Sequence, residues 1–361
     1  MQSRFSLKLG KPFGIKVSIH WTFSLLIAWI VFISVNRGLE FGQIMMHILF
    51  ILAIFGCVLL HELGHSLAAI KLGGKVQSIT LLPIGGMASI SEMPEKPRDE
   101  FLISAAGPLV NVVIAGLIWF YLSVISPIDM GEITYEVITP GNFLVMLLTA
   151  NLFIVAFNLI PAFPMDGGRL FRSALSIRMS KLKATRIAKD IGQIFAIMFI
   201  ITGFFHNPFL IIIGFFILLG AKGEYEMMKY RDILNNYTVR DVIKKDYEEL
   251  DENDNLATAA EKFAHTSPRG FVVTSGGKYA GILTRNDLIR GLNTNGKEGR
   301  VGDLAGGTEE DIDTDMVLFD AFKKMQMKKL DIVPVTEKGK FAGIIELEGI
   351  NEFFLIRNAI R

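Results

Sequence analysis

The 361-residue chain has a single cysteine, Cys57, and almost no net charge. One cysteine excludes an internal disulfide. Lysine and arginine total 37 and aspartate and glutamate total 36, giving a net charge of +1, so the basic excess expected of a nucleic-acid-binding protein is lacking. The first residues also lack the features of a cleavable signal peptide, because basic residues are scattered up to Ile19 and no small-residue cleavage site follows a short apolar core.

Apolar residues are abundant instead. They make up 51% of the chain, and the mean hydropathy is +0.42, which is too apolar for an ordinary soluble protein. Charged residues are sparse between residues 17 and 221 and dense from Lys222 onward. We therefore predict an integral membrane domain at residues 1–223, a linker at residues 224–237 and a soluble domain at residues 238–361.

Six segments of the first part approach the length of about 20 residues that crosses a bilayer as a helix. They are Ile19–Val35, Ile44–Ile70, Phe101–Ile125, Phe143–Leu159, Ile187–Phe205 and Phe209–Leu219. We predict six transmembrane helices. The last segment is short, so a re-entrant hairpin formed by the last two segments is an alternative.

Loop charges predict the orientation in the membrane. The loop at residues 126–140 carries Asp129, Glu132 and Glu136 and neither lysine nor arginine. The connection after the fourth segment carries Arg169, Arg172, Arg178, Lys181, Lys183, Arg186 and Lys189. Because basic loops stay in the cytoplasm, we predict that this connection is cytoplasmic. The basic N-terminal tail and, after an even number of spans, the C-terminal domain then also lie in the cytoplasm.

The second apolar segment contains the sequence His61-Glu62-Leu63-Gly64-His65. Residues four apart share one face of a helix, so both imidazoles can bind one metal ion while Glu62 lies beside them as a general base. Zinc needs a third protein ligand if a position is to stay open for water. A third histidine of the metzincin type is excluded, because Lys71 and Ala68 occupy the positions where its histidine and glycine would stand.

Asp166 is the best candidate for the third ligand. Asp99 and Glu100, by contrast, open a helix, where carboxylates suit the positive end of the helix dipole. Asp166 follows an apolar stretch with two prolines and precedes Gly167-Gly168, which allow a sharp turn. Irregular backbone at membrane depth is expected only where it lines a cavity, and an anionic ligand partly neutralises a buried metal ion.

These motifs resemble the site-2 protease family of intramembrane zinc metalloproteases. The resemblance rests on residues 61–65 together with Asn158-Leu159-Ile160-Pro161 and Pro164-Met165-Asp166-Gly167-Gly168, and Gly107-Pro108-Leu109-Val110-Asn111 is similar to a further family motif. It extends over residues 14–219. It implies that His61, His65 and Asp166 bind zinc, that Glu62 is the general base, and that the substrate is a membrane-tethered or membrane-associated protein.

Other residues near these motifs have predicted roles of their own. Asn158 is a candidate for stabilising the oxyanion or the unwound substrate, whereas Asn111 and Asn151 are less favoured for this role and can instead bond between helices. Cys57 lies one turn before His61 and is predicted to be a small buried residue rather than a ligand. Residues 76–91 predict a short β-hairpin around Gly85-Gly86, and the family resemblance implies that it could pair with an extended substrate.

The C-terminal part contains two copies of one unit at an offset of 62 residues. Gly277-Lys278-Tyr279-Ala280-Gly281-Ile282-Leu283 aligns with Gly339-Lys340-Phe341-Ala342-Gly343-Ile344-Ile345. Each copy predicts helix, strand, turn, strand and helix, with the copies at about residues 238–293 and 300–357. The unit resembles a tandem pair of cystathionine-β-synthase (CBS) domains with an α/β fold.

The resemblance to CBS domains implies a regulatory role. Such pairs often bind adenine nucleotides such as ATP, ADP or AMP, and the ribose and phosphate signature implies Asp287 on ribose and Thr284 on phosphate. The second copy departs from it, because Glu346 replaces the threonine and Gly349 the aspartate. At most one site with a complete signature is therefore expected, and a purely structural role or homodimerisation through the CBS pair is the alternative.

We thus predict an intramembrane zinc endopeptidase that acts in the lipid bilayer near its cytoplasmic face and is gated by a cytoplasmic domain. A nucleotide-regulated metal-ion transporter that uses the same histidines as a transit site is the main alternative. Polar residues are expected along a whole transport path, whereas here they concentrate around His61 and Asp166. A catalytically inactive binding protein is a third hypothesis, against which the intact ligands and Glu62 argue.

Overall fold

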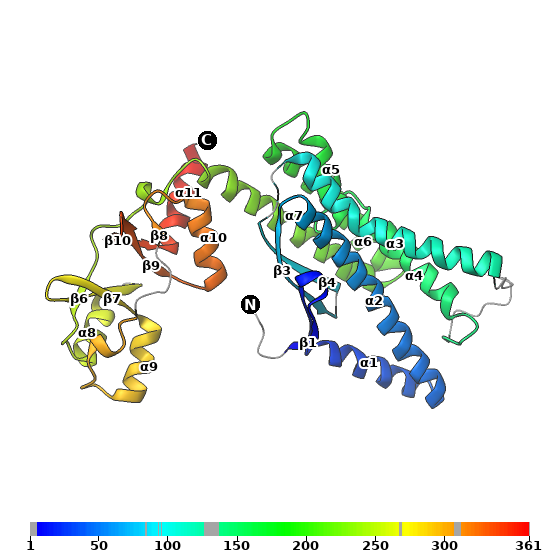
Figure 1. Ribbon diagram of the computed structural model, residues 1–361, viewed down its shortest axis with the longest axis horizontal. Helices are drawn as coiled ribbons and strands as arrows, with labels where there is room; N and C mark the ends of the chain where they lie inside the picture. The colour runs from blue at the N-terminus through cyan, green and yellow to red at the C-terminus, as the bar shows by residue number, and fades with distance from the viewer. Residues whose placement is uncertain are drawn as a thin grey trace. The chain divides into compact units, whose positions relative to one another are not determined.

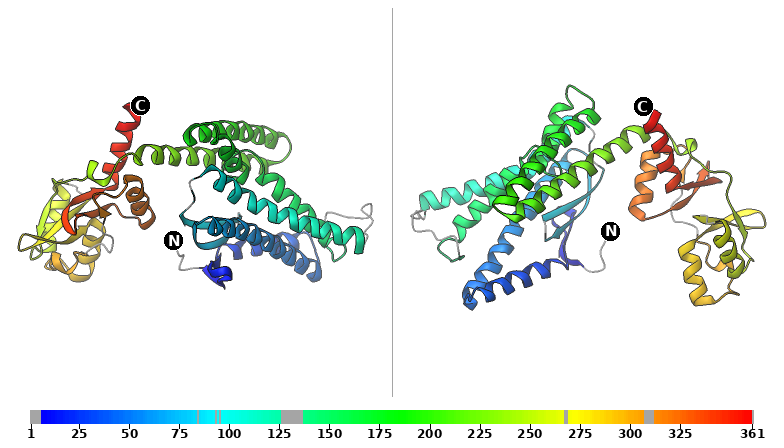
Figure 2. Two further views of the ribbon diagram at one scale, coloured as in Figure 1. Left: turned by 45° about the horizontal axis from the view of Figure 1, so that its top comes forward. Right: turned by 180° about the vertical axis from the view of Figure 1, so that it is seen from behind.

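The computed structural model describes residues 6–83, 85–92, 94, 96–125, 137–266, 269–306 and 312–360. It divides into two compact units, Met1–Glu226 and Met227–Arg361. The first unit is helical with one sheet, and the second is an α/β unit (Figures 1 and 2).

Six apolar helices of the first unit occupy the predicted segments, in agreement with the expected helical membrane fold. They are α1 (Phe23–Asn36), α2 (Phe41–Lys71), α3 (Pro97–Phe120), α4 (Phe143–Asn158), α6 (Lys181–Phe205) and α7 (Pro208–Leu234). Four of them, α2, α3, α6 and α7, are long and apolar enough to cross a membrane, whereas α1 and α4 have 14 and 16 residues. A turn of π-helix, Tyr121–Ile125, follows α3, and a shorter helix, α5 (Asp166–Leu175), lies between α4 and α6.

The last two apolar helices are complete rather than short. α6 has 25 residues and α7 has 27, separated by His206 and Asn207. The last apolar segment was predicted to end at Leu219 because charged residues follow, but the backbone stays helical through Glu224 to Leu234. The shortness of the last segment, on which the re-entrant alternative rested, is therefore not observed. The acidic loop residues Asp129, Glu132 and Glu136 lie outside the described residues.

The predicted hairpin is part of a larger sheet. β3 (Lys75–Leu82) and β4 (Gly85–Glu92) pair antiparallel, and β2 (Lys16–His20) pairs parallel with β3 and antiparallel with β1 (Ser6–Gly10). The strand order is β1-β2-β3-β4, which places β4 at one edge. The sequence pattern predicts no strand in the N-terminal segment, because five-residue strands carrying lysine and glycine give too little alternation to be recognised.

Small residues allow α2 and α3 to pack closely. A Cβ atom on Gly64 of α2 would lie 2.8 Å from Val110 Cγ2 and 2.9 Å from the Ala106 carbonyl oxygen of α3. On the facing helix, a Cβ atom on Gly107 would lie 2.2 Å from His65 Nε2. The glycines within both sequence motifs therefore let the two backbones approach, which is a common device in membrane helix packing.

The second unit contains the predicted repeat. The first copy comprises β5 (Glu249–Asp251), α8 (Leu256–Thr266), β6 (Gly270–Ser275), β7 (Lys278–Thr284) and α9 (Arg285–Asn295). The second comprises β8 (Ile312–Asp313), α10 (Leu318–Lys328), β9 (Ile332–Glu337), β10 (Lys340–Glu346) and α11 (Leu347–Ile360). Each copy forms a three-stranded sheet, and each includes a short parallel strand, β5 or β8, that the sequence pattern did not reveal.

The expected linker at residues 224–237 is helical up to Leu234, because α7 continues across the division between the units. The end of α7 belongs to the core of the second unit, where Leu234 is fully buried. Tyr230 stacks on Phe354 of α11 with ring centroids 3.7 Å apart. One continuous helix is therefore shared by both units.

Candidate metal centre

Three side chains predicted as metal ligands meet at one point of the first unit. His61 Nε2 lies 3.1 Å from Asp166 Oδ2, His65 Nε2 lies 2.9 Å from the same oxygen, and the two Nε2 atoms are 3.1 Å apart. All three residues are buried, although they are separated by up to 105 positions in the sequence. The structure thus brings the first residue of α5 to the two histidines of α2, as the prediction required.

The second nitrogen of each imidazole has its own partner on α3. His65 Nδ1 lies 2.7 Å from the Ile103 carbonyl oxygen, which can only accept, so Nδ1 carries the proton. His61 Nδ1 lies 2.6 Å from Asn111 Oδ1, and the amide group of Asn111 donates to Asn151 of α4 at 2.8 Å. Both Nε2 atoms therefore present lone pairs toward Asp166, the tautomer that metal-binding histidines adopt.

This donor set fits a zinc ion. Two lone pairs and a carboxylate oxygen within 3.1 Å of one another repel, and a cation among them turns that repulsion into attraction. The ligand atoms of a tetrahedral zinc site lie roughly 3.3 Å apart, because each is about 2.0–2.2 Å from the metal. The observed separations are only a few tenths of an ångström shorter, and two imidazoles with one carboxylate leave a fourth position open.

Local sequence explains how Asp166 reaches this point. Asp166 is the first residue of α5, after an irregular connection from the end of α4. A Cβ atom on Gly167 would lie 2.2 Å from the Ile160 carbonyl oxygen, and one on Gly168 would lie 2.6 Å from the Ala162 carbonyl carbon. The two glycines therefore let the start of α5 pack directly on the preceding connection, where larger residues would push Asp166 away.

Glu62 lies beside the metal centre and against the sheet. It is partly buried on α2, between the two histidines in sequence. A Cβ atom on Gly86 would lie 2.4 Å from Glu62 Cγ, so the edge strand β4 passes directly over this side chain. A larger residue at position 86 would displace Glu62, which explains why the hairpin needs glycine there.

The structure assigns the other predicted polar residues different places. Asn151 donates to the Leu147 carbonyl oxygen at 2.9 Å and lies 3.4 Å from Cys57 Sγ. Asn111 and Asn151 thus bond between helices as predicted, and the hydrogen bond between them continues from Asn111 to His61. Cys57 is buried outside the triad. Asn158 donates to the Ile154 carbonyl oxygen of its own helix at 3.0 Å, so its amide nitrogen is directed to its own backbone rather than to the triad.

Sequence reasoning missed the α3 residues that orient the histidines. Nothing in the sequence identifies Ile103, because its contribution is a backbone carbonyl oxygen. Asn111 was noticed as part of a motif, yet its contact with His61 depends on the close approach of α2 and α3. The one available signal was an asparagine in an apolar helix, which calls for a polar partner in the same protein interior.

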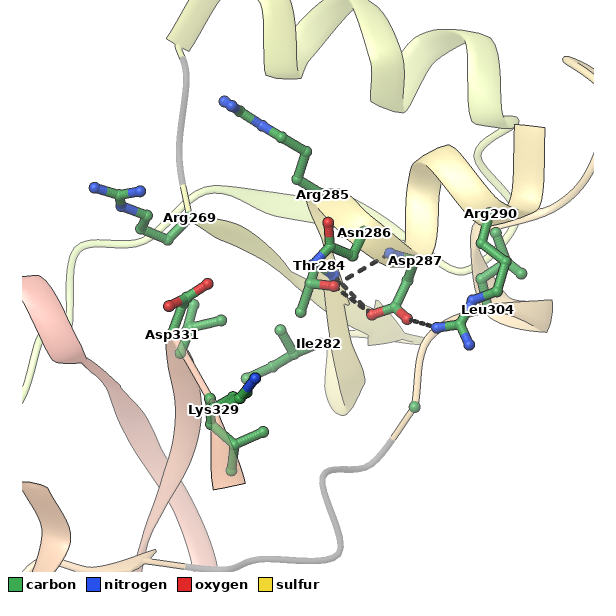
Figure 3. A pocket seen from close by; sticks show the side chains of 13 residues that line it. Arg269, Ile282, Thr284, Arg285, Asn286, Asp287, Arg290, Leu304, Lys329 and Asp331 are labelled. Atoms are coloured by element: carbon green, nitrogen blue, oxygen red, sulfur yellow. Dashed lines mark hydrogen bonds and ion pairs between the residues drawn. The ribbon is translucent and has the colours of Figure 1, made fainter. Parts of the chain in front are cut away.

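The second unit holds the residues predicted to bind nucleotide. Thr284 and Asp287 line a cavity of about 460 Å³ to which both copies of the repeat contribute (Figure 3). The Thr284 hydroxyl donates to Asp287 at 2.5 Å, and Arg290 pairs with the other carboxylate oxygen of Asp287. Arg269 also lines the cavity, and its hydrogen bond to Glu348 raises the pKa of its guanidinium, so it stays charged.

Comparison with known proteins relates the chain to zinc metalloproteases. The family model of peptidase family M50 matches residues 49–132 and 121–202, and the CBS domain model matches residues 239–294. A zinc metalloprotease of Methanocaldococcus jannaschii is 33% identical over 345 residues, which cover 94% of each chain. The structure of a site-2 protease from the same organism is 36% identical and covers 61% of this chain and 95% of that one, with a TM-score of 0.45.

A CBS domain pair in complex with 5-methylthioadenosine and S-adenosyl-L-methionine is 21% identical and covers 33% of this chain and 97% of that one, with a TM-score of 0.30. The identity to the M. jannaschii relative over nearly the whole length of both proteins is what decides the family. The chain belongs to peptidase family M50, the site-2 protease type of zinc metalloprotease, and it carries a CBS domain.

Proposed function

We propose that this protein is an intramembrane zinc endopeptidase that cleaves a membrane-tethered or membrane-associated protein. The observation that supports this most directly is the position of the triad: His61 and His65 lie on α2, a helix of 31 residues that is apolar enough to cross a membrane. His65 is six residues before the end of α2 at Lys71, or roughly 9 Å along the helix axis. The reacting group of the substrate would therefore reach the site within the apolar layer.

Each residue of the centre has a proposed role. His61, His65 and Asp166 bind the metal, and zinc held there would activate a water molecule and polarise the scissile carbonyl group. Glu62 takes the proton of the attacking water and passes it to the leaving amine. The bonds from His61 to Asn111 and from His65 to Ile103 hold both imidazoles in the required tautomer. Asn158 stays a candidate for stabilising the oxyanion.

The edge strand supports a way to present the substrate. A helical substrate hides its peptide bonds, so the segment to be cut must become extended before cleavage. β4 is at the edge of the sheet, and its residue Gly86 lies against Glu62. An extended substrate added to β4 by backbone hydrogen bonds would run past the general base, in the manner of other β-strand additions.

We place both termini in the cytoplasm. The basic residues between α4 and the middle of α6 favour the cytoplasmic side, and so does the N-terminal segment with Lys8, Lys11 and Lys16. Six crossings return the CBS unit to the same side. With α1 leading outward and α2 returning, the triad lies toward the cytoplasmic end of α2.

Reconstitution distinguishes the endopeptidase from the alternative of a metal-ion transporter. The zinc-loaded protein is placed in liposomes with tagged single-span membrane proteins, and a zinc-sensitive dye is enclosed in the lumen. We expect fragments whose new ends map within the span, and zinc entry no faster than in empty liposomes. Zinc entry without any fragment would favour the transporter, and neither fragments nor zinc entry would favour a catalytically inactive binding protein.

For the second unit we propose that the cavity binds an adenine nucleotide and regulates cleavage. Four basic side chains, Arg269, Arg285, Arg290 and Lys329, line it against two acidic ones, Asp287 and Asp331. The excess of positive charge suits phosphates, and the volume lies in the range of about 300–1,000 Å³ that is typical of small-molecule sites. Arg290 and Thr284 would exchange their bonds to Asp287 for bonds to the ligand.

Calorimetry with the full-length protein in detergent tests this proposal. We expect ATP, ADP or AMP to bind with a Kd between about 1 μM and 1 mM. Asp287→Ala should weaken binding about 10- to 100-fold, because it removes hydrogen bonds from ribose to a charged acceptor. The matched control is Asp320→Ala, an exposed carboxylate in the first turn of α10. If none of the three nucleotides produces heat, homodimerisation through the CBS pair becomes the simpler role.

A further inference from the structure

A second buried cluster of charges lies near the metal centre without belonging to it. Arg172 of α5 is 4% exposed and Glu100 of α3 is 1% exposed. Arg172 Nε donates to Glu100 Oε1 at 2.7 Å, and its Nη1 donates to Glu224 Oε1 of α7 at 2.7 Å. Lys181, at the start of α6, lies 2.7 Å from the other oxygen of Glu100. Two cations and two anions thus join four helices.

The arginine side chain is held from all sides. Its Nη2 contacts the same Glu100 oxygen as its Nε, and its guanidinium carbon lies 4.9 Å from the ring centroid of Phe163. Buried ion pairs of this kind add little net stability, because the loss of hydration offsets most of the attraction. Their best-attested use is to fix one geometry among several, which here is the position of α5 relative to α3.

That geometry matters for the metal centre. Asp166 begins α5, and Arg172 follows it by six residues, or roughly 9 Å along the helix axis. On the other side of the ion pair, α3 bears the Ile103 carbonyl oxygen and the Asn111 amide that hold the two imidazoles. The guanidinium of Arg172 therefore connects the helix that carries the third candidate ligand to the helix that orients the first two.

We propose that Arg172 is a positioning residue for the zinc site, which it serves by clamping α5 to α3, and that Glu224 completes this clamp from α7. The inference rests on the proposed role of Asp166 as a zinc ligand. The clamp acts at a distance from the metal, so Arg172 touches neither substrate nor zinc. A misplaced α5 would move the Asp166 carboxylate away from the two Nε2 atoms and weaken zinc binding.

Glu224 makes the clamp depend on the helix shared with the CBS unit. It lies two residues before the division between the units, on the same helix as Tyr230 and Leu234, which are packed into the second unit. Its side chain is 34% exposed, in contrast to the 2% of Glu100. Glu224 is therefore the partner of Arg172 that a shift of α7 would release first.

The test measures zinc affinity, by competition with a chelating dye, for the full-length protein in detergent. Arg172→Lys keeps the positive charge but cannot bridge Glu100 and Glu224 with a planar fork. We expect it to weaken zinc binding about 10- to 100-fold, as other outer-shell changes do. Arg178→Lys is the matched control, because Arg178 is exposed and follows the same helix, and it should bind zinc as the wild type does.

A second variant keeps the test decisive if Arg172→Lys does not fold. Glu224→Gln changes a partly exposed side chain and should weaken zinc binding about 3- to 10-fold, a smaller effect because Glu100 still holds Arg172. Wild-type zinc affinity in the folded Arg172→Lys variant overturns the proposal. If that variant does not fold, wild-type affinity in Glu224→Gln overturns it instead.

Two further measurements separate a positioning role from a role in stability alone. A merely structural role would lower the thermal stability of the zinc-free protein and leave the zinc affinity unchanged, which also contradicts the proposal. Asp166→Ala tests the assumption that Asp166 is a zinc ligand, on which the positioning role rests. Loss of zinc in Asp166→Ala with wild-type affinity in Arg172→Lys refutes only the positioning role, whereas wild-type affinity in Asp166→Ala refutes the ligand assignment itself.

Discussion

Replacing Glu62 with glutamine is expected to lower the rate of peptide-bond cleavage about 10³-fold, within the range for loss of a general base. Glutamine has the same shape and keeps the contact with Gly86, but it cannot accept the proton of the attacking water. The triad of His61, His65 and Asp166 does not include this side chain, so the zinc content should stay at the wild-type level. Cleavage is measured on a tagged membrane substrate and zinc by elemental mass spectrometry.

Glu40→Gln is the matched control for this experiment. Glu40 precedes the first turn of the same helix and is exposed, 22 positions before Glu62. It should cleave at the wild-type rate. Cleavage by Glu62→Gln at a rate near that of this control would refute the proposed proton transfer, and joint loss of zinc and activity would instead show that Glu62 is needed to build the site.

The sequence predicts helices far better than it predicts their packing. Six apolar segments correspond to six helices, because a long apolar run has few alternatives to a buried helix. The strands β1 and β2 escaped prediction, since β2 is held by pairing with β3 across more than fifty residues and β1 is held by pairing with β2, rather than by a pattern of their own. The length of α7 was underestimated for a related reason: hydropathy ends at Leu219, but the helix gains further support from the second unit.

The residues of the candidate site also differ in how well the sequence predicts them. His61, Glu62 and His65 could be predicted because one helical turn fixes their spacing. Asp166 could be predicted because irregular backbone that carries a carboxylate at membrane depth is expected only where it lines a cavity. The partners on α3 could not, because a backbone carbonyl oxygen has no sequence signature and the Arg172 cluster depends on four helices meeting. Contacts within one helical turn can be predicted from the sequence, whereas contacts between helices depend on how the chain folds.

The Arg172 cluster also changes how the basic connection between α4 and α6 is understood. The sequence suggested that its cations serve mainly to orient the protein in the membrane. Arg172 and Lys181 instead form ion pairs with Glu100. The side chain of Lys181 is largely covered, with 26% of its surface exposed, whereas Arg178 lies on the surface. Basic residues in one loop can thus combine a topological preference for the cytoplasm with a structural role beside the metal centre.

Replacing Asp166 with alanine is expected to weaken zinc binding more than about 100-fold, beyond the range typical of residues that only support a ligand. The change leaves two neutral imidazoles, which bind zinc poorly without an anionic partner in a buried site. Cleavage should fall together with zinc occupancy. The stability of the zinc-free protein should not fall, because the alanine variant removes a carboxylate that faces two lone pairs at 2.9 and 3.1 Å.

The measurement is a chelator titration of zinc together with thermal unfolding in the absence of metal. Asp190→Ala is the control, because Asp190 is an exposed carboxylate of α6 that pairs with Lys189 at 2.8 Å, and it should bind zinc as the wild type does. A variant that loses both zinc and zinc-free stability would indicate that Asp166 mainly supports the start of α5. The proposed assignment predicts that zinc binding is lost while the stability of the zinc-free protein is kept, because a metal ligand is required only when the metal is bound.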